Sequence, residues 1–161
     1  MPMLNVDQLR VDLIRPSLDG LGKWSPQAEN LLLLTAAVES ALGTYVRQKG
    51  GGPALGIYQM EPTTHDDIWA NWLRYKPDMV ERILDTCGIS RDECRAERLV
   101  WDLRYATCMT RCHYLRVRHT IPGPQNWPAL AEYYKAHYNT PLGKGSAEGA
   151  LQACKACGVF V

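Results

Sequence analysis

The residue with the clearest chemical potential in this sequence is Glu39, which follows the apolar segment 31–38. Four consecutive leucines open that segment and a glycine-rich stretch comes after Glu39, so we expect a buried helix that ends at an open cleft. Burying a carboxylate is costly unless the group is paired or protonated. A glutamic acid in apolar surroundings has a raised pKa and can donate a proton near neutral pH. The pattern therefore predicts a general acid, and the alternative is a partly exposed carboxylate at a helix end.

Three short motifs follow one another along the chain, and Glu39 begins the first of them. These are Glu-Ser at 39–40, Gly-Ile-Tyr-Gln at 56–59 with Pro62 and Thr63 close behind, and Tyr-Asn at 138–139. In this order they resemble the lytic transglycosylase family of the lysozyme superfamily, whose pattern is Glu-Ser, then Gly-Leu-Met-Gln, then Ala-Tyr-Asn-Ala-Gly. The resemblance spans roughly residues 28–145. The third motif departs from the family because it continues as Thr-Pro-Leu-Gly, and the loop after Glu39 lacks a serine that the family often carries.

The resemblance implies a mainly α, lysozyme-like single domain over residues 1–161, with a central buried helix that ends at Glu39 and a minor β-element near 55–60. It implies cleavage of the β-1,4 bond between N-acetylmuramic acid and N-acetylglucosamine in peptidoglycan, without a metal or a cofactor. Glu39 would donate a proton to the leaving oxygen and then take one from a hydroxyl of the substrate, which closes a 1,6-anhydro ring. The residues that would bind the substrate are Ser40, Tyr58, Gln59, Glu61, Tyr138 and Asn139.

Two other functions stay open. A hydrolytic muramidase needs a second carboxylate, and Glu61, two residues after Gln59, is the candidate. A non-catalytic virion protein could retain the fold for assembly or for wall binding.

Composition indicates a globular chain with 46% hydrophobic and 22% charged residues. The net charge of +1 gives no field that would attract nucleic acid, and the apolar segment 31–38 is too short to span a membrane. Asp7 and Asp12 interrupt the N-terminal apolar residues, so we expect no secretory signal. For a wall-cleaving protein this favours a bacteriophage setting. The protein would sit in the virion or in the host cytoplasm before delivery to the periplasm, with glycan strands and other virion proteins as partners.

The six cysteines are expected to be free thiols, because disulfides belong to secreted chains. Cys154 and Cys157 form a lone C-x-x-C motif, for which a redox pair or a zinc site is the alternative.

Capping residues and apolar periodicity predict helices through most of the chain. Pro16 is expected to end the first helix, and Ser25 with Pro26 to begin the central one. A capping box of Ser90 and Glu93 is expected to open the longest helix, with Trp101 on its apolar stripe. The predicted ranges are 5–15, 25–42, 63–76, 78–87, 90–118, 127–137 and 146–158.

Overall fold

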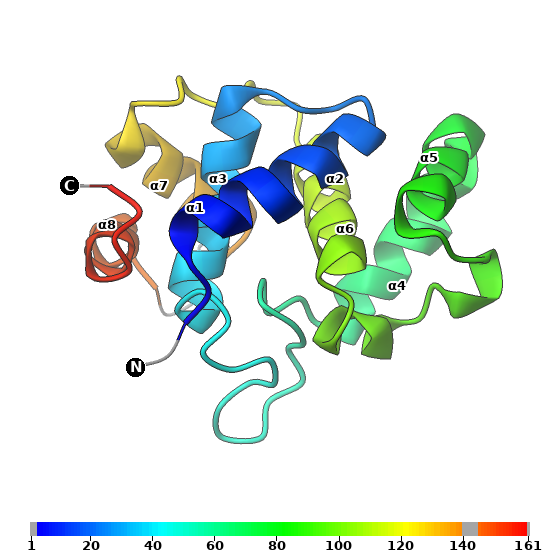
Figure 1. The fold of residues 1–161 in the computed structure, drawn as a ribbon, viewed down its shortest axis with the longest axis horizontal. Helices are drawn as coiled ribbons and strands as arrows, with labels where there is room; N and C mark the ends of the chain where they lie inside the picture. Colours follow the sequence, from blue (N-terminus) through cyan, green and yellow to red (C-terminus); the bar gives the residue numbers. More distant parts are fainter. Residues whose placement is uncertain (1–2, 140–144, 161) are drawn as a thin grey trace.

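The central element of the computed structural model, which describes residues 3–139 and 145–160, is helix α3 (Pro26–Ser40). Figure 1 shows α3 between α7 and α8 on one side and α6 on the other, with the N-terminal helices crossing it. Most of its residues are buried, as expected for a helix that is apolar all round. The Ser25 hydroxyl accepts a hydrogen bond from the Ala28 amide at 3.1 Å and caps its start, as predicted. The fold is a mainly α single domain.

Residues 6–20 form one continuous helical stretch of α1 (Val6–Gln8), the π-helical turns η1 (Leu9–Ile14) and α2 (Arg15–Gly20). The predicted helix end at Pro16 is therefore wrong. A proline within an α-helix lacks the N–H, and its ring clashes with the carbonyl four residues earlier. Here the Arg15 amide donates to the Arg10 carbonyl, five residues back, and the wider π-helical turn accommodates Pro16.

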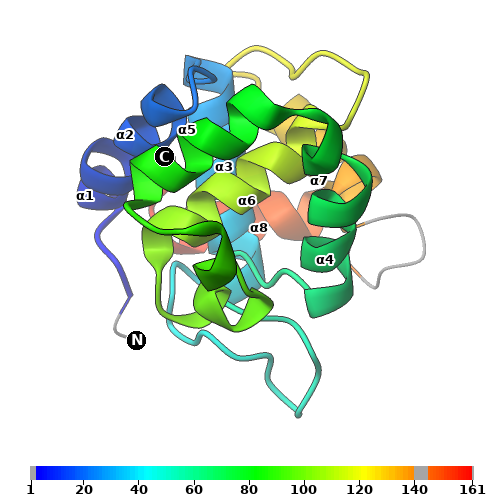
Figure 2. The same cartoon turned by 90° about the vertical axis from the view of Figure 1, so that its right-hand side faces the viewer.

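The segment after the long loop 44–61 forms α4 (Pro62–Asn71), the 3₁₀ turn η2 (Leu73–Tyr75) and α5 (Pro77–Cys87). Gly88 follows α5 with a φ of 65°, which is the predicted C-terminal glycine. The predicted cap by Thr63 or Thr64 is wrong, because Glu61 occupies the capping position of α4 and makes no side-chain cap. The helix predicted over 63–76 also ends early, at Asn71, and η2 follows it. Figure 2 shows α4 and α5 on the face turned toward the viewer, and α5 packs on α2.

The predicted single helix over 90–118 is wrong. The segment instead contains the 3₁₀ turns η3 (Arg91–Glu93) and η4 (Ala96–Val100) and then α6 (Leu103–Leu115). The capping box of Ser90 and Glu93 is present, but it caps only η3. Asp102 starts a new helix, because its carboxylate accepts a hydrogen bond from the Tyr105 amide at 2.9 Å. Trp101, predicted to lie in the core, is 62% exposed and lies against Arg98.

The C-terminal part consists of α7 (Trp127–His137) and α8 (Ala147–Ala156), which pack on each other and on α3. The Ser146 hydroxyl caps α8 through the Gly149 amide at 3.0 Å, as predicted. No strand forms within the described ranges. The β-element expected near 55–60 is limited to isolated antiparallel bridges, which join Arg47 to Leu55 and Leu55 to Met60.

All six cysteines are free thiols, and Cys154 and Cys157 are both buried. No helix in the described part of the chain combines the length and the apolar character that crossing a membrane requires.

Candidate active site

The Glu39 side chain lies in a surface hollow of about 420 Å³, which we call the Glu39 hollow. Its walls come from the end of α3, from the loop 44–61, from α7 and Asn139 two residues beyond its end, and from the start of α8 with the two residues before it. The lining residues are Val38, Glu39, Tyr45, Gln48, Ala54, Gln59, Glu61, Tyr134, Asn139, Gly145, Ser146, Gly149 and Ala150.

The environment of Glu39 favours the protonated acid. Burial of the carboxyl group raises the pKa of Glu39 to about 7, although a hydrogen bond from Tyr134 partly lowers it. The Tyr134 hydroxyl donates this bond to Glu39 Oε2. No basic side chain lies within ion-pair distance of the carboxylate among the described residues. With a pKa of about 7, a substantial fraction of Glu39 therefore still carries its proton at neutral pH.

Stacked tyrosines hold Tyr134 in place. The ring of Tyr138 stacks on Tyr134 at 5.9 Å between centroids and on Tyr114 at 5.4 Å. The Tyr138 hydroxyl donates to the Tyr58 carbonyl at 2.6 Å, which ties the end of α7 to the loop 44–61. Burial and the neighbouring Glu39 carboxylate raise the pKa of Tyr134, so its hydroxyl remains a hydrogen-bond donor.

The residues 56–59 form a tight turn that reaches the end of α3. Gly56 has a φ of 81°, and a Cβ atom there would lie 2.2 Å from the Leu99 carbonyl oxygen, so only glycine fits. The Gly56 carbonyl accepts hydrogen bonds from the Gln59 amide at 3.1 Å and from Gln59 Nε2 at 2.8 Å. The Ser40 hydroxyl donates to the Ile57 carbonyl at 2.6 Å and accepts from the Gly43 amide at 2.9 Å. These bonds fix the turn beside Glu39.

Of the residues predicted to bind substrate, Gln59, Glu61 and Asn139 line the Glu39 hollow. Glu61 is exposed, Gln59 is mostly buried, and Asn139 accepts a hydrogen bond from Lys135 at 2.8 Å.

The other predicted site residues, Ser40, Tyr58 and Tyr138, do not line the hollow. Ser40 and Tyr58 are buried, and the Tyr58 hydroxyl pairs with Thr107 at 2.9 Å. Tyr138 supports the site through the stacked tyrosines, and Ser40 supports it through the turn at 56–59.

Sequence reasoning missed Tyr134 and Tyr45. Tyr134 lies one helical turn before Tyr138, and that spacing on a predicted helix was the available signal. Tyr45 donates from its hydroxyl to the Glu39 carbonyl oxygen at 2.8 Å. Burial, followed by the charge of Glu39, raises the pKa of Tyr45.

Backbone strain is concentrated at this site. Among the described residues, positive φ angles at non-glycine positions occur at Ala41 (49°), Leu42 (54°) and Gln59 (48°). Ala41 and Leu42 directly follow α3, and Gln59 lines the Glu39 hollow. Each such residue costs about 1–2 kcal/mol relative to ordinary backbone. Strained residues that persist in a fold often lie at functional sites.

Comparisons with models of protein families, with curated proteins and with solved structures find no match to this chain. Within the described residues, no group of three or more histidine, cysteine, aspartate or glutamate side chains is placed to hold a metal ion.

Proposed function

We propose that this chain cleaves peptidoglycan as a lytic transglycosylase, at the β-1,4 bond between N-acetylmuramic acid and N-acetylglucosamine. The observation that carries this proposal is the pKa of about 7 for Glu39, whose side chain lines a surface hollow. Cleavage of a glycosidic bond needs a proton for the departing oxygen, and an acid with a pKa near the working pH supplies it best. The motif order at 39–40, 56–59 and 138–139 directs the proposal to peptidoglycan.

In the first step, the protonated Glu39 donates its proton to the glycosidic oxygen as the bond to the muramic acid C1 breaks. In the second step, the Glu39 carboxylate takes a proton from the C6 hydroxyl of the same sugar while that oxygen bonds to C1. The product is a 1,6-anhydro ring, no water is consumed, and Glu39 returns to its protonated form. The Tyr134 hydroxyl donates to Glu39 Oε2 and supports the charged form between the two steps.

The second candidate is a hydrolytic muramidase. The observation in its favour is that Glu61 lines the same hollow as Glu39 and is exposed, so a second carboxylate is present for activating water.

Clearing of purified cell wall tests the catalytic role of Glu39. Wild type should clear the wall, and Glu39→Gln should reduce the rate by at least about a hundredfold, because general acid catalysis contributes that much. Circular dichroism of both proteins controls for folding. Equal activity of the two proteins, or inertness of both with the fold intact, would contradict the catalytic proposal. In the second case a non-catalytic virion protein is the better reading.

Mass spectrometry of the released muropeptides separates the two enzymatic candidates. Anhydro products are lighter than hydrolysed products by one water, about 18 Da, because the sugar hydroxyl replaces water as the nucleophile. The proposal expects anhydro products from both wild type and Glu61→Gln. Hydrated products that disappear in Glu61→Gln would establish the muramidase instead.

We further propose a bacteriophage setting in which the virion delivers the protein to the periplasm. Detection of the protein in purified particles would support this setting, and its restriction to the lysate would contradict it.

A further inference from the structure

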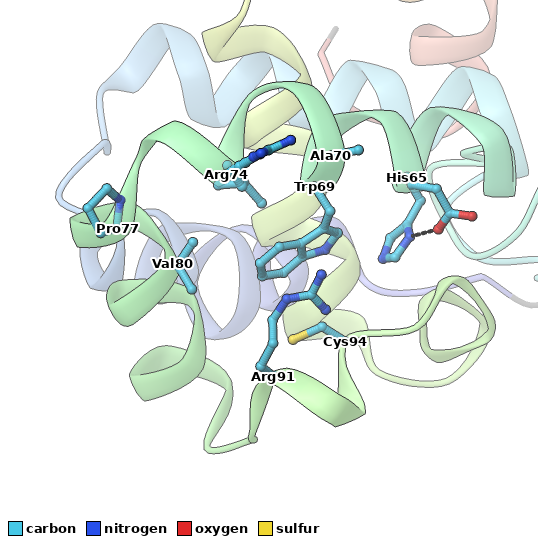
Figure 3. A pocket seen from close by; sticks show the side chains of 10 residues that line it. His65, Trp69, Ala70, Arg74, Pro77, Val80, Arg91 and Cys94 are labelled. Atoms are coloured by element: carbon cyan, nitrogen blue, oxygen red, sulfur yellow. Dashed lines mark hydrogen bonds and ion pairs between the residues drawn. The ribbon is translucent and has the colours of Figure 1, made fainter.

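A second hollow, of about 700 Å³, lies between α4, η2, the start of α5 and the turn η3, and we call it the Trp69 hollow (Figure 3). Its volume is within the range of small-molecule sites, roughly 300–1,000 Å³. Apolar side chains form much of its wall, and these are Trp69, Ala70, Leu73, Pro77 and Val80. It shares no lining residue with the Glu39 hollow.

The charges around the Trp69 hollow favour a single negative charge on a ligand. Arg74 and Arg91 line it, and neither forms an ion pair with a carboxylate among the described residues. Asp66 adds one negative charge, and burial lowers the pKa of His65, so that this histidine is neutral near pH 7. Two cations and one anion leave one positive charge unbalanced. A monoanion fits this balance better than a dianion does.

A network of hydrogen bonds holds the hollow in one shape. The Tyr105 hydroxyl oxygen accepts from Trp69 Nε1 at 2.9 Å and lies 2.7 Å from His65 Nε2. His65 Nδ1 lies 2.8 Å from the Asp66 carboxylate, which Figure 3 marks with a dashed line. A single arrangement satisfies all three contacts: His65 Nδ1–H donates to Asp66, and Tyr105 O–H donates to His65 Nε2.

Arg91 is already placed for recognition of an anion. Its guanidinium lies over the Trp69 ring, 3.8 Å from the centroid. A guanidinium is planar, and its N–H groups point outward from its edge. When its face stacks on a ring, two of these N–H groups can still pair with both oxygens of a carboxylate. Because Trp69 orders Arg91 in advance, binding loses less side-chain entropy.

We propose that the Trp69 hollow binds the C-terminal carboxylate of a short peptide whose last side chains are small and apolar. Arg91 pairs with the carboxylate, and the apolar wall at Pro77 and Val80 takes the side chain. Asp66, whose side chain is 74% exposed, accepts a hydrogen bond from a peptide N–H. Such a terminus has two sources, a cell-wall peptide with D-residues and the tail of a ribosomal chain with L-residues. The wall source rests on the proposed function, and the ribosomal source does not.

Calorimetric titration with N-acetyl-D-alanyl-D-alanine, its L,L counterpart and the C-terminal amide of each tests the proposal. At least one acid should bind, and its amide should bind about tenfold more weakly or worse, because the amide loses a charged pair with Arg91. Tighter binding of the D,D acid identifies the wall source, and equal or tighter binding of the L,L acid identifies the ribosomal source. Equal affinity for an acid and its amide, or no binding of either acid at millimolar concentration, would overturn the proposal.

Substitutions of Arg91 test whether this residue binds the peptide carboxylate. Arg91→Gln should lower the affinity for the preferred acid by about tenfold or more. Arg91→Lys should recover only part of this affinity, because lysine cannot form a bidentate pair with a carboxylate. Arg118→Gln is the matched control, since Arg118 is an exposed arginine outside the Trp69 hollow, and it should bind like wild type. Glu39→Gln should also bind like wild type, so this assay stays valid if the proposed enzymatic function fails. Unchanged affinity in Arg91→Gln would refute the assignment.

Discussion

At the scale of single residues, Glu39 and Tyr134 form the most informative pair. They are 95 positions apart in the sequence, and the hydroxyl of one donates to the carboxyl of the other. Burial raises the pKa of Glu39, and this hydrogen bond opposes the rise because it favours the charged form. The tyrosine therefore keeps the acid from becoming too weak to release its proton.

Replacing Tyr134 with phenylalanine should raise the pKa of Glu39. The hydrogen bond to the ionised carboxylate is lost while the ring and its packing remain, and such a bond corresponds to about one pH unit or more. The measurement is an NMR titration of the Glu39 side-chain carboxyl carbon, which needs no enzymatic activity. Tyr133→Phe is the control, because the Tyr133 hydroxyl donates to the His119 carbonyl instead. A midpoint that stays in place or moves down in Tyr134→Phe would refute this account.

At the scale of the elements, the turn at 56–59 decides where the loop 44–61 meets the end of α3. Gly56 combines a positive φ with close approach to the Leu99 carbonyl, whereas Gly51 has a similar φ of 83° and no atom within 4 Å of an added Cβ. Substituting each glycine with alanine therefore separates the free-energy cost of a positive φ from the cost of a clash with the Leu99 carbonyl.

Gly56→Ala should destabilise the protein by about 2 kcal/mol or more, and Gly51→Ala by about 1 kcal/mol, because only the first adds a clash with backbone to the conformational strain. Thermal unfolding followed by circular dichroism measures both, and each kcal/mol corresponds to about 2–4 °C in a protein of this size. Equal losses of Tm in the two variants would show that the approach to Leu99 is not what fixes this turn.

The elements that the sequence predicted well are those with local signals. Ser25 and Ser146 cap helices through amides three residues away, and Gly88 ends α5, so each boundary is encoded within a few residues. The helix over 90–118 was predicted wrongly because residues at helical spacing continue through three separate pieces. The Asp102 cap between them is a weaker signal than the periodicity.

The candidate site likewise contains one part that the sequence predicts and another that depends on the tertiary fold. Glu39 could be predicted because its apolar helix is contiguous in sequence. The partnership with Tyr134 depends on how α7 packs against α3, and the burial of Tyr58 depends on Thr107 in α6. Contacts of this kind come from the tertiary fold, which a single sequence does not display.

At the scale of the whole molecule, the buried Glu29 joins the N-terminal helices to the core. Glu29 accepts hydrogen bonds from Arg15 at 2.8 Å, from Arg10 at 2.9 Å and from the Trp24 indole at 2.8 Å. Burial alone would raise the pKa of Glu29, but these bonds outweigh it and the pKa is lowered. The network connects η1, α2 and the loop at Trp24 to the first turn of α3.

Glu29→Gln should lower the free energy of unfolding at pH 7 by about 2–3 kcal/mol, since it leaves two arginines without their carboxylate. Because the folded pKa is lowered, the stabilisation from Glu29 is fully present above its unfolded value, about 4.3, and is lost as the pH falls through the folded value. The difference in Tm between wild type and Glu29→Gln should therefore shrink below about pH 4. Glu132→Gln, on an exposed position of α7, is the control and should follow wild type at every pH. A difference in Tm that is constant with pH would mean that the charge of Glu29 does not matter.

Helix α3 thus carries two glutamates ten positions apart, about 15 Å along its axis, whose pKa values are displaced in opposite directions. The one near its start stabilises the contact with the N-terminal helices while it is ionised, and the one near its end has to be protonated to act as the proposed acid. Together they define a pH range that has a lower and an upper edge. Acidification below its lower edge removes the stabilisation that Glu29 contributes, and a pH above about 7 removes the proton that the proposed reaction needs. A single helix holds one carboxyl group among cations and the other among apolar and aromatic side chains. Both the stability of this protein and its proposed activity should therefore be greatest in mildly acidic and neutral surroundings.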